Sequence, residues 1–296
     1  MKVEIIAVGT EVLMGDIVNT NAQYIARMLS MLGLGTYYHS AVGDNAQRLK
    51  EMFEVGFKRA DIIITTGGLG PTKDDLTKEV AGDFFNKEMV LDHATLENIE
   101  SFFIKLGRPL TENNKKQAYF PRGSTIVPNV YGTAPGCIIE DKGKTLIMLP
   151  GPPSEMKPMF QNYITPYLAK YAAGILVSTI IRMFGIGESS MEQLIEDIIQ
   201  NQTNPTIAPY AKEGELILRL TAWGQNKEEA LNAMEPVKQE LYERLGKYIY
   251  GEGEEGLSTL VCQALINQNL SISVAESCTG GMISDTLIGF SGISQV

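Results

Sequence analysis

The strongest chemical signal in the chain is a glycine-rich turn followed by two adjacent carboxylates, in residues 65–77. Gly67, Gly68 and Gly70 would let backbone N–H groups approach an oxyanion, because glycine carries no Cβ. A short apolar run precedes the turn, and residues 76–85 are predicted to form a helix. A strand, a glycine turn and a helix N-terminus together make an anion site. The pattern therefore predicts a cradle for phosphate.

Asp74 and Asp75 place negative charge where the phosphates would lie. Carboxylates repel phosphate unless a divalent cation lies between them or they act as acid or base. We therefore predict that both residues are catalytic and bind a metal ion, with a phosphate-bearing substrate. In the alternative interpretation, the two acids only cap the helix by accepting hydrogen bonds from its free N–H groups.

Two further glycine-containing turns follow predicted strands, one at residues 9–21 and one at residues 149–156. If these strands are parallel, all three turns lie at the edge of the sheet where ligands of open α/β sheets bind. The additional candidates for binding substrate or phosphate are Gly9, Thr10, Asn21, Gly151 and Ser154.

Three of the polar residues at this edge have competing interpretations. Glu11 could bind a metal ion or could lie in a solvated loop. Asp44 could reach the same edge as a catalytic residue, or could cap the helix predicted from residue 46. Ser154 begins a helix, and capping is the better explanation for this residue taken alone.

The spacing of apolar residues predicts the elements that position these turns. The predicted strands of the first region are 3–8, 37–42, 61–65, 137–140 and 145–149. The predicted helices are 22–32, 46–58, 76–85, 113–119 and a long segment from about 150 to 171. Such alternation predicts an α/β domain, a doubly wound and mostly parallel sheet with helices on both faces.

The pattern divides the chain into three parts. Residues 1–172 are predicted to form the α/β domain, and residues 173–250 a small α+β domain. The elements of the α+β domain are strands 175–184, 215–223 and a short one at 248–249, and helices 189–200 and 227–245. Residues 251–296 contain a glycine-rich linker, helix 257–268, strand 271–275 and helix 282–288. This last part is too short to close an α/β domain, so we expect it to be truncated.

Composition restricts the class of protein. Asp plus Glu number 35 and Lys plus Arg number 25, which gives a formal net charge of −10. This balance disfavours binding to nucleic acid or to an anionic membrane surface. The three cysteines are far apart and odd in number, which favours neither a disulfide framework nor a zinc site. We find no signal peptide and no apolar run of transmembrane length, so we expect a cytoplasmic protein.

Five strings of residues resemble those of the CinA family of competence/damage-inducible proteins, and the resemblance covers the whole chain. They are EIIAVGTEVLMGDIVNTNA (4–22), VGDN (42–45), ITTGGLGPTKDDLT (64–77), LPGPPSEM (149–156) and AESCTGG (275–281). The resemblance implies a molybdopterin-binding-like fold for the first domain and a KH-like fold for the second. It also implies that the tail is the beginning of a nicotinamide-nucleotide amidase domain.

The same resemblance implies two activities. The first domain would be a metal-dependent ADP-ribose pyrophosphatase, and a complete C-terminal domain would deamidate nicotinamide mononucleotide. Ser277, Thr279 and Ser294 would belong to the truncated amidase site. Ser294 lies in the G-x-S context of the family's amidase serine, but the tyrosine and lysine that follow it in the family have no counterpart here.

We therefore expect a divalent cation, Mg²⁺, Mn²⁺ or Co²⁺, with potassium as a further candidate. The expected partner is a small nucleotide substrate, with neither nucleic acid nor membrane, and the family leads us to expect a homodimer. Two alternatives stay open at this point. One is a module that binds a pterin or nucleotide without turnover, and the other is a competence-related interaction protein.

Overall fold

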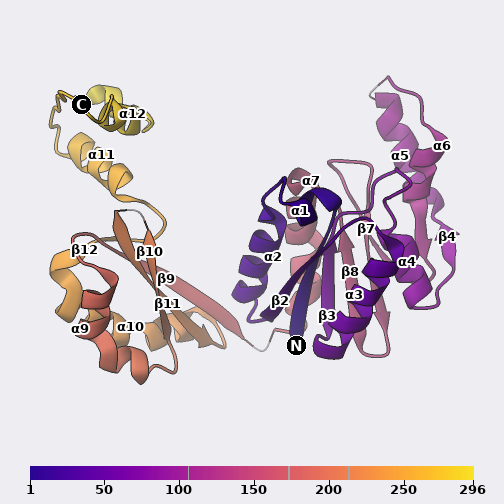
Figure 1. Ribbon diagram of the computed structural model, residues 1–296, viewed down its shortest axis with the longest axis horizontal. Helices are drawn as coiled ribbons and strands as arrows, with labels where there is room; N and C mark the ends of the chain where they lie inside the picture. The colour runs from indigo at the N-terminus through magenta and orange to yellow at the C-terminus, as the bar shows by residue number, and fades with distance from the viewer. Residues whose placement is uncertain (106, 173, 213) are drawn as a thin grey trace. The chain divides into compact units, whose positions relative to one another are not determined.

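A computed structural model of the chain describes residues 1–105, 107–172, 174–212 and 214–296 (Figure 1). The chain divides into two compact units, Met1–Ala173 and Gly174–Val296. Within the described part of the chain, no helix is both long and apolar enough to cross a lipid bilayer.

A six-stranded sheet with the strand order β2-β1-β3-β8-β7-β6 forms the centre of the first unit. Its parallel strands are β1 (Lys2–Val8), β2 (Gly35–Val42), β3 (Ile62–Thr66) and β8 (Lys144–Leu149). Its antiparallel strands are β7 (Gly136–Asp141) and β6 (Thr125–Val127). The predicted strands are thus present, and the mostly parallel sheet is confirmed.

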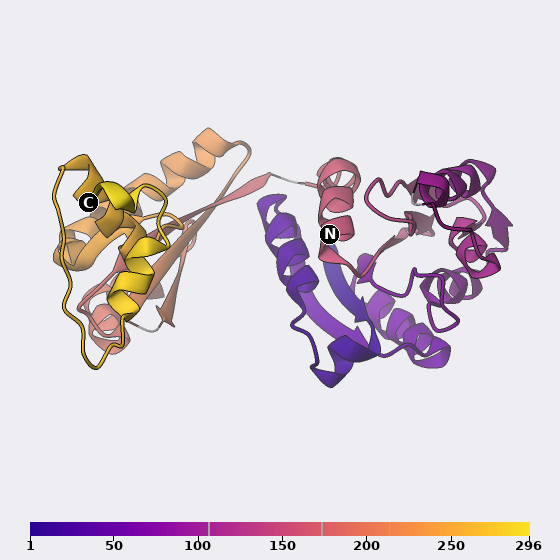
Figure 2. The same cartoon turned by 90° about the horizontal axis from the view of Figure 1, so that it is seen from above.

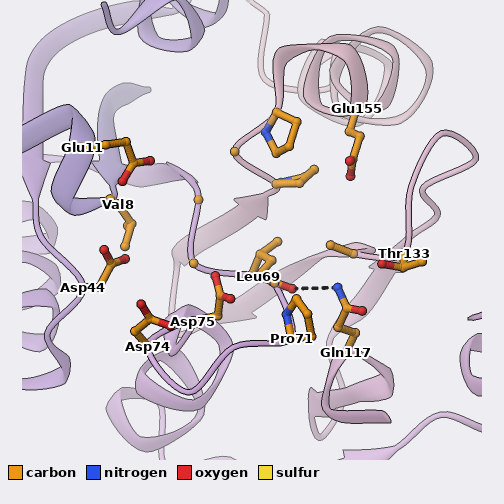
Figure 3. A pocket seen from close by; sticks show the side chains of 18 residues that line it. Val8, Glu11, Asp44, Leu69, Pro71, Asp74, Asp75, Gln117, Thr133 and Glu155 are labelled. Atoms are coloured by element: carbon orange, nitrogen blue, oxygen red, sulfur yellow. Dashed lines mark hydrogen bonds between the residues drawn. The ribbon is translucent and has the colours of Figure 1, made fainter. Parts of the chain in front are cut away.

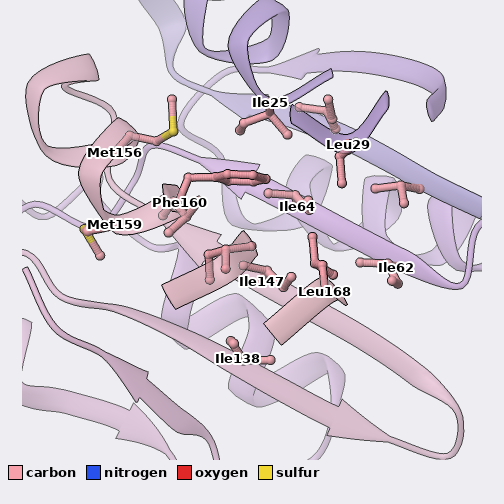
Figure 4. Close-up of a cluster of buried hydrophobic side chains, with 14 of the residues drawn as sticks. Ile25, Leu29, Ile62, Ile64, Ile138, Ile147, Met156, Met159, Phe160 and Leu168 are labelled. Carbon is pink, nitrogen blue, oxygen red and sulfur yellow. The ribbon is translucent and has the colours of Figure 1, made fainter. Parts of the chain in front are cut away.

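Helices cover both faces of this sheet, as Figures 1 and 2 show. One face carries α2 (Thr20–Met31), α7 (Pro153–Met159), the π-helical turn η2 (Phe160–Ile164) and α8 (Thr165–Ala169). The other face carries α3 (Ala46–Arg59) and α4 (Thr77–Phe84). Because successive residues of a strand point to opposite faces, β1 supplies Ile5 to one core and Ile6 to the other. Figure 4 shows the first core, where Phe160 and Ile25 meet Ile64 of β3.

Several elements of the first unit were not predicted. Helix α1 (Thr10–Met14) and strands β4 (Met89–Leu91), β5 (Tyr119–Pro121) and β6 span too few residues to show a period. Helix α5 (His93–Lys105) is 13 residues long and was missed as well. Strands β4 and β5 pair with each other as a separate small sheet. The predicted helix 113–119 corresponds to α6 (Glu112–Lys115) and the 3₁₀ turn η1 (Lys116–Ala118).

The second unit contains a four-stranded antiparallel sheet in the order β10-β11-β9-β12. The strands are β9 (Ile175–Met183), β10 (Thr206–Lys212), β11 (Glu215–Gly224) and β12 (Ile249–Glu252), and only β10 was not predicted. Helices α9 (Glu188–Gln200) and α10 (Lys227–Leu245), with the turn η3 (Gly246–Tyr248), complete the α+β fold. Met191 and Leu241 of the two helices pack against Leu218 of β11 in one core.

The last segment contains α11 (Leu257–Asn267), α12 (Met282–Ile288) and the turn η4 (Ile293–Gln295). The prediction of a strand at residues 271–275 is wrong, because these residues have no regular structure. A strand needs a neighbour for its backbone groups, and no described strand pairs with this segment. Glu276 begins the next turn, where hydrogen bonds from the hydroxyl and N–H of Ser284 and the N–H of Ile283 lower the pKa of its carboxyl to about 2.

A buried carboxylate joins three elements of the first unit. Glu4 of β1 is fully buried and accepts a hydrogen bond from Ser40 of β2 at 2.7 Å. Arg59 of α3 donates through Nε at 2.9 Å to Oε2 and through Nη2 at 2.7 Å to Oε1. Its guanidinium lies 3.8 Å from the centre of the Tyr38 ring. Two charge-assisted hydrogen bonds and a stacked ring thus fix the position of Arg59.

We predict that Arg59→Met lowers the free energy of unfolding by about 3 kcal/mol, because it leaves Glu4 buried without its charge partner. Urea denaturation measures this loss. Lys50→Met is the control. Lys50 also lies on α3, but it pairs with Asp83 of α4 at the protein surface, so its loss should lower the free energy of unfolding far less. Equal losses in the two variants would contradict a special role for the buried pair.

Candidate functional site

Four loops meet at the carboxyl ends of the parallel strands. They begin at Gly9, Gly43, Gly67 and Pro150, after β1, β2, β3 and β8 respectively. These four strands are neighbours in the sheet and run in one direction, so the loops lie side by side. The predicted common edge, including a fourth loop at Asp44, is therefore confirmed.

The loops enclose a pocket of about 410 Å³, shown in Figure 3. Eighteen residues line it. Those that the sequence predicted are Gly9, Glu11, Asp44, Gly67, Gly68, Gly70, Asp74, Asp75 and Gly151. The structure thus brings the glycine turns and all four predicted acids to one cavity.

Three other candidates of the first unit do not line this pocket. Thr10 supports it, because its N–H and its hydroxyl both donate to Oδ2 of Asp44 at 2.9 Å. Asn21 donates to the carbonyl oxygen of Gly151 at 2.6 Å and so holds the last of the four loops. Ser154 is exposed on α7, and its predicted capping role is wrong because Pro152 is the N-cap and no side chain caps this helix.

The tail candidates belong to the other unit. Ser277, Thr279 and Ser294 lie in the segment of the second unit that contains α12.

Asp44 does not cap α3, and Asp74 and Asp75 do not cap α4, so the capping alternative is wrong for these three residues. Asn45, rather than Asp44, caps α3 by accepting a hydrogen bond from the N–H of Arg48 at 3.0 Å. Helix α4 begins after Leu76 without any side-chain cap, although Asp74 and Asp75 lie just before it. The acids therefore serve the loops and the pocket.

Thr72 organises the loop that carries the two adjacent acids. Its N–H donates to Oδ2 of Asp75 at 3.0 Å, and its hydroxyl contacts both Asp75 and Asp74. The hydroxyl contact is the main reason why the pKa of Asp74 is lowered. Lys116 donates to the carbonyl oxygens of Thr72 and Asp75, so this cation fixes the backbone of the loop.

Gly67 and Gly68 are required by the packing of the turn itself. Gly67 has a φ of +105°, and a Cβ there would lie 1.9 Å from the carbonyl oxygen of Val8. Gly68 has a φ of +66°, and its Cβ would lie 2.1 Å from the hydroxyl of Thr77. Within the described residues, the N–H groups of Gly68 and Gly70 donate to no other group. They are therefore available to an oxyanion.

The lining of the pocket is strongly anionic. It contains five carboxylates, those of Glu11, Asp44, Asp74, Asp75 and Glu155, and the described lining residues include no lysine, arginine or histidine. Over the same described ranges, no three His, Cys, Asp or Glu side chains converge closely enough to hold a metal ion by themselves. Mg²⁺ prefers oxygen ligands and is often bound by one or two carboxylates together with substrate phosphates. The carboxylate oxygens fit a divalent cation only where groups from outside the protein complete its coordination.

Sequence reasoning missed Glu155, Gln117 and Thr133 among the polar lining residues. Glu155 lies in the string LPGPPSEM, but only Gly151 and Ser154 were selected from it. Gln117 comes from η1, and its side-chain amide donates to the carbonyl oxygen of Leu69 at 3.4 Å. Neither Gln117 nor Thr133 lies in a glycine turn that follows a predicted strand, so no local pattern marks them. The other unpredicted lining residues are Val8, Leu69, Pro71, Ala134, Pro150 and Pro152.

A buried lysine lies behind Gln117. Lys78 is 3% exposed, donates to the carbonyl oxygen of Gln117 at 2.7 Å and has its Nζ 4.3 Å from the centre of the Phe120 ring. Burial lowers the pKa of its ammonium group to about 8. The lysine thus positions the backbone of a pocket residue without lining the pocket.

Comparison with family models divides the chain into three matches. Residues 4–170 match a model described as probable molybdopterin binding domain. Residues 178–251 match the damage-inducible protein CinA KH domain, and residues 254–296 match the CinA C-terminal domain.

Individual proteins give the same result. The chain is 56% identical over 296 residues to a CinA-like protein of Dictyoglomus turgidum, covering 100% of this chain and 72% of that protein. It is 55% identical over 297 residues to a Clostridium perfringens protein named as competence-damage inducible, with the same two coverages. The crystal structure of CinA from Thermoplasma acidophilum is similar with a TM-score of 0.52 and 32% identity, covering 58% of this chain and 97% of that one.

We predict that Gly67→Ala lowers stability by clearly more than the 1–2 kcal/mol that a left-handed backbone costs alanine, because the new Cβ meets the backbone of Val8. Thermal and urea unfolding measure the effect. Gly143→Ala is the matched control, since Gly143 also has a positive φ of +77° but has nothing within 4 Å of its Cβ. The expectation fails if both variants lose the same stability.

A second prediction concerns pH. With the pKa of Lys78 lowered from 10.5 to about 8, the unfolded chain binds a proton between these values that the folded protein does not. Stability rises with pH wherever the unfolded state binds more protons, so the Lys78 contribution should rise from about pH 8 to 10.5. The urea midpoint of the unchanged protein should therefore rise relative to that of Lys78→Met between pH 8 and pH 9.5. A constant difference would show that Lys78 remains fully charged in the folded state.

Proposed function

The chain belongs to the CinA family, and we propose that its first unit is a metal-dependent pyrophosphatase that hydrolyses ADP-ribose. One observation carries the proposal. Five carboxylates and the free N–H groups of a glycine turn line the same pocket, whose described lining offers no cationic side chain. A diphosphate would be repelled by these acids unless a cation accompanies it. The resemblance to the family supplies the identity of the nucleotide.

Each loop has a distinct role in this proposal. The N–H groups of Gly68 and Gly70 bind phosphate oxygens, as N–H groups of glycine turns do in other anion sites. Asp74 and Asp75 would hold the cation, from a loop that Thr72 and Lys116 keep in one conformation. Glu11 lines the same cavity and would be a further oxygen ligand. A divalent cation bound there would neutralise phosphate charge and lower the pKa of the attacking water.

Asp44 is the group that we assign to proton transfer. Two donors from Thr10 occupy its Oδ2, which fixes the carboxylate and leaves Oδ1 for the water. Water attacks one phosphorus, its proton passes to Asp44, and the bond from that phosphorus to the bridging oxygen breaks. The products are AMP and ribose 5-phosphate. General-base assistance of this kind contributes roughly a hundredfold to ten-thousandfold in rate.

Incubation with ADP-ribose and Mg²⁺, Mn²⁺ or Co²⁺, with and without potassium, tests the proposal by chromatographic detection of AMP. Binding of ADP-ribose without AMP formation would favour a module that binds a nucleotide or pterin without turnover. If ADP-ribose neither binds nor reacts under any of these conditions, a competence-related interaction protein becomes the better interpretation.

We predict that Asp75→Asn lowers kcat by at least about a hundredfold, because the amide cannot bind the cation as a carboxylate does. Steady-state kinetics and urea unfolding of the same preparation separate catalysis from folding. The amide oxygen can still accept the N–H of Thr72, so stability should change little. Asp83→Asn, at an exposed aspartate that pairs with Lys50, should retain full activity. Undiminished turnover in folded Asp75→Asn would remove Asp75 from the mechanism.

A further inference from the structure

We infer that Glu155 and the loop of residues 129–134 form a nucleoside subsite, in which the Glu155 carboxylate accepts hydrogen bonds from the two hydroxyls of a ribose. The inference rests on the proposed function, because it assumes that the ligand of the pocket is a nucleotide. It assigns Glu155 to recognition of the sugar rather than to the cation or the phosphates.

The first argument is the way in which Glu155 is held. Asn129 donates through Nδ2 to Oε2 of Glu155 at 2.6 Å and to the carbonyl oxygen of Ala134 at 3.1 Å. Its Oδ1 accepts the N–H of Tyr131 at 3.0 Å. One asparagine therefore closes the loop on itself and fixes the carboxylate at the same time. Such an arrangement keeps a side chain in one position before a ligand binds.

The glycine of this loop supports the same conclusion. A Cβ at Gly132 would lie 2.3 Å from Oε2 of Glu155, so the loop backbone wraps closely around the carboxylate. Oε1 of Glu155 accepts no hydrogen bond from any described residue, and the side chain lines the pocket. The carboxylate thus has one oxygen bound by the protein and one offered to a ligand.

The second argument is the place of Glu155 within the pocket. Figure 3 shows Glu155 extending from α7 on the side of the pocket that carries Thr133, while Glu11 and Asp44 lie on the opposite side. An ionised carboxylate is an acceptor only, so it repels phosphate and binds hydroxyl groups. A vicinal diol presents two O–H donors to one carboxylate, and in dinucleotide-binding folds an acidic residue binds ribose in this way. The sugar is therefore the part of a nucleotide that fits Glu155.

The third argument distinguishes the two riboses of ADP-ribose. Tyr131 and Val130 belong to the loop that holds Glu155, and they are 61% and 68% exposed. Exposed aromatic side chains beside a sugar site can stack on a base, which contributes roughly 1–3 kcal/mol per base. Only the adenosine end of the substrate carries a base. The subsite is therefore assigned to adenosine.

Calorimetric titration with AMP, 2′-deoxy-AMP and 3′-deoxy-AMP in the presence of Mg²⁺ tests the inference. Hydrogen bonds to a charged group contribute about 1.5–3 kcal/mol, so the unchanged protein should bind AMP roughly tenfold to a hundredfold more tightly than at least one deoxy analogue. Glu155→Ala should weaken AMP binding by that factor and leave the affinity for the same analogue nearly unchanged. This non-additivity is what a direct contact produces and a purely structural role does not.

Two further variants sharpen the test. Glu112→Ala removes an exposed carboxylate outside the pocket and should preserve the discrimination between AMP and its analogues. Tyr131→Ala should weaken AMP binding by about tenfold and leave the affinity for ribose 5-phosphate unchanged. Thermal unfolding of each variant shows whether it folds, and Glu155→Gln replaces Glu155→Ala if the latter does not.

The outcomes separate this inference from the proposed activity. If the protein hydrolyses ADP-ribose but binds AMP and both deoxy analogues equally, the subsite assignment is overturned and the pyrophosphatase proposal stands. If it discriminates through Glu155 but forms no AMP from ADP-ribose, the subsite stands without the activity. Absence of AMP binding, or an equal loss of ribose 5-phosphate affinity in Tyr131→Ala, also overturns the nucleoside assignment.

Discussion

The close approach of Gly67 to the ends of β1 and β8 is the constraint on which the pocket depends. Its N–H donates to the carbonyl oxygen of Leu149 at 2.9 Å, and the position of its missing Cβ lies 1.9 Å from the carbonyl oxygen of Val8. One residue therefore joins the carboxyl ends of three neighbouring strands. Because this contact fixes the strand ends relative to one another, the loops that follow them begin at fixed points. The packing of the turn therefore requires glycine, and the same backbone geometry leaves its N–H groups free.

The pocket concentrates like charges, and the fold around it explains how this arrangement is held. Two apolar cores, one on each face of the sheet, fix the strands that carry the loops. Neutral donors hold these acids, from the same loop in one case and from another segment in two: Thr72 holds Asp75, Thr10 holds Asp44 and Asn129 holds Glu155. Lys116 donates to the backbone carbonyls of Thr72 and Asp75 and pairs at 3.4 Å with Glu79, which does not line the pocket. The negative charge stays available to a cation or to hydroxyl groups, which is the property that the proposed chemistry needs.

The acids of the pocket are consequently not equivalent. Asp74 and Asp75 share one short loop and one hydroxyl partner, so they are suited to act together on one ion. Glu155 comes from a different element and is bound by a loop that carries exposed apolar side chains. The same functional group can thus serve different parts of one ligand, because its surroundings differ. Families that share a fold differ in chemistry through loop residues of this kind.

Much of this protein could be predicted from its sequence because the signals are local. The buried run before Thr65 predicted a strand, and the helical spacing of Ile25 and Leu29 predicted a covering helix. The alternation of such elements predicted a parallel sheet, and its parallel order predicted that Gly9, Asp44 and Gly67 share one edge. Residues 271–275 show the limit of this reasoning, since their alternation of serine with apolar residues predicted a strand, but no described strand pairs with them. Only the tertiary structure decided that Gln117, Thr133 and Glu155 line the pocket and that Ser154 does not. The physical reason is that a side chain's direction depends on contacts between segments far apart in the chain, such as Asn129 with Glu155, and no local pattern encodes such a contact.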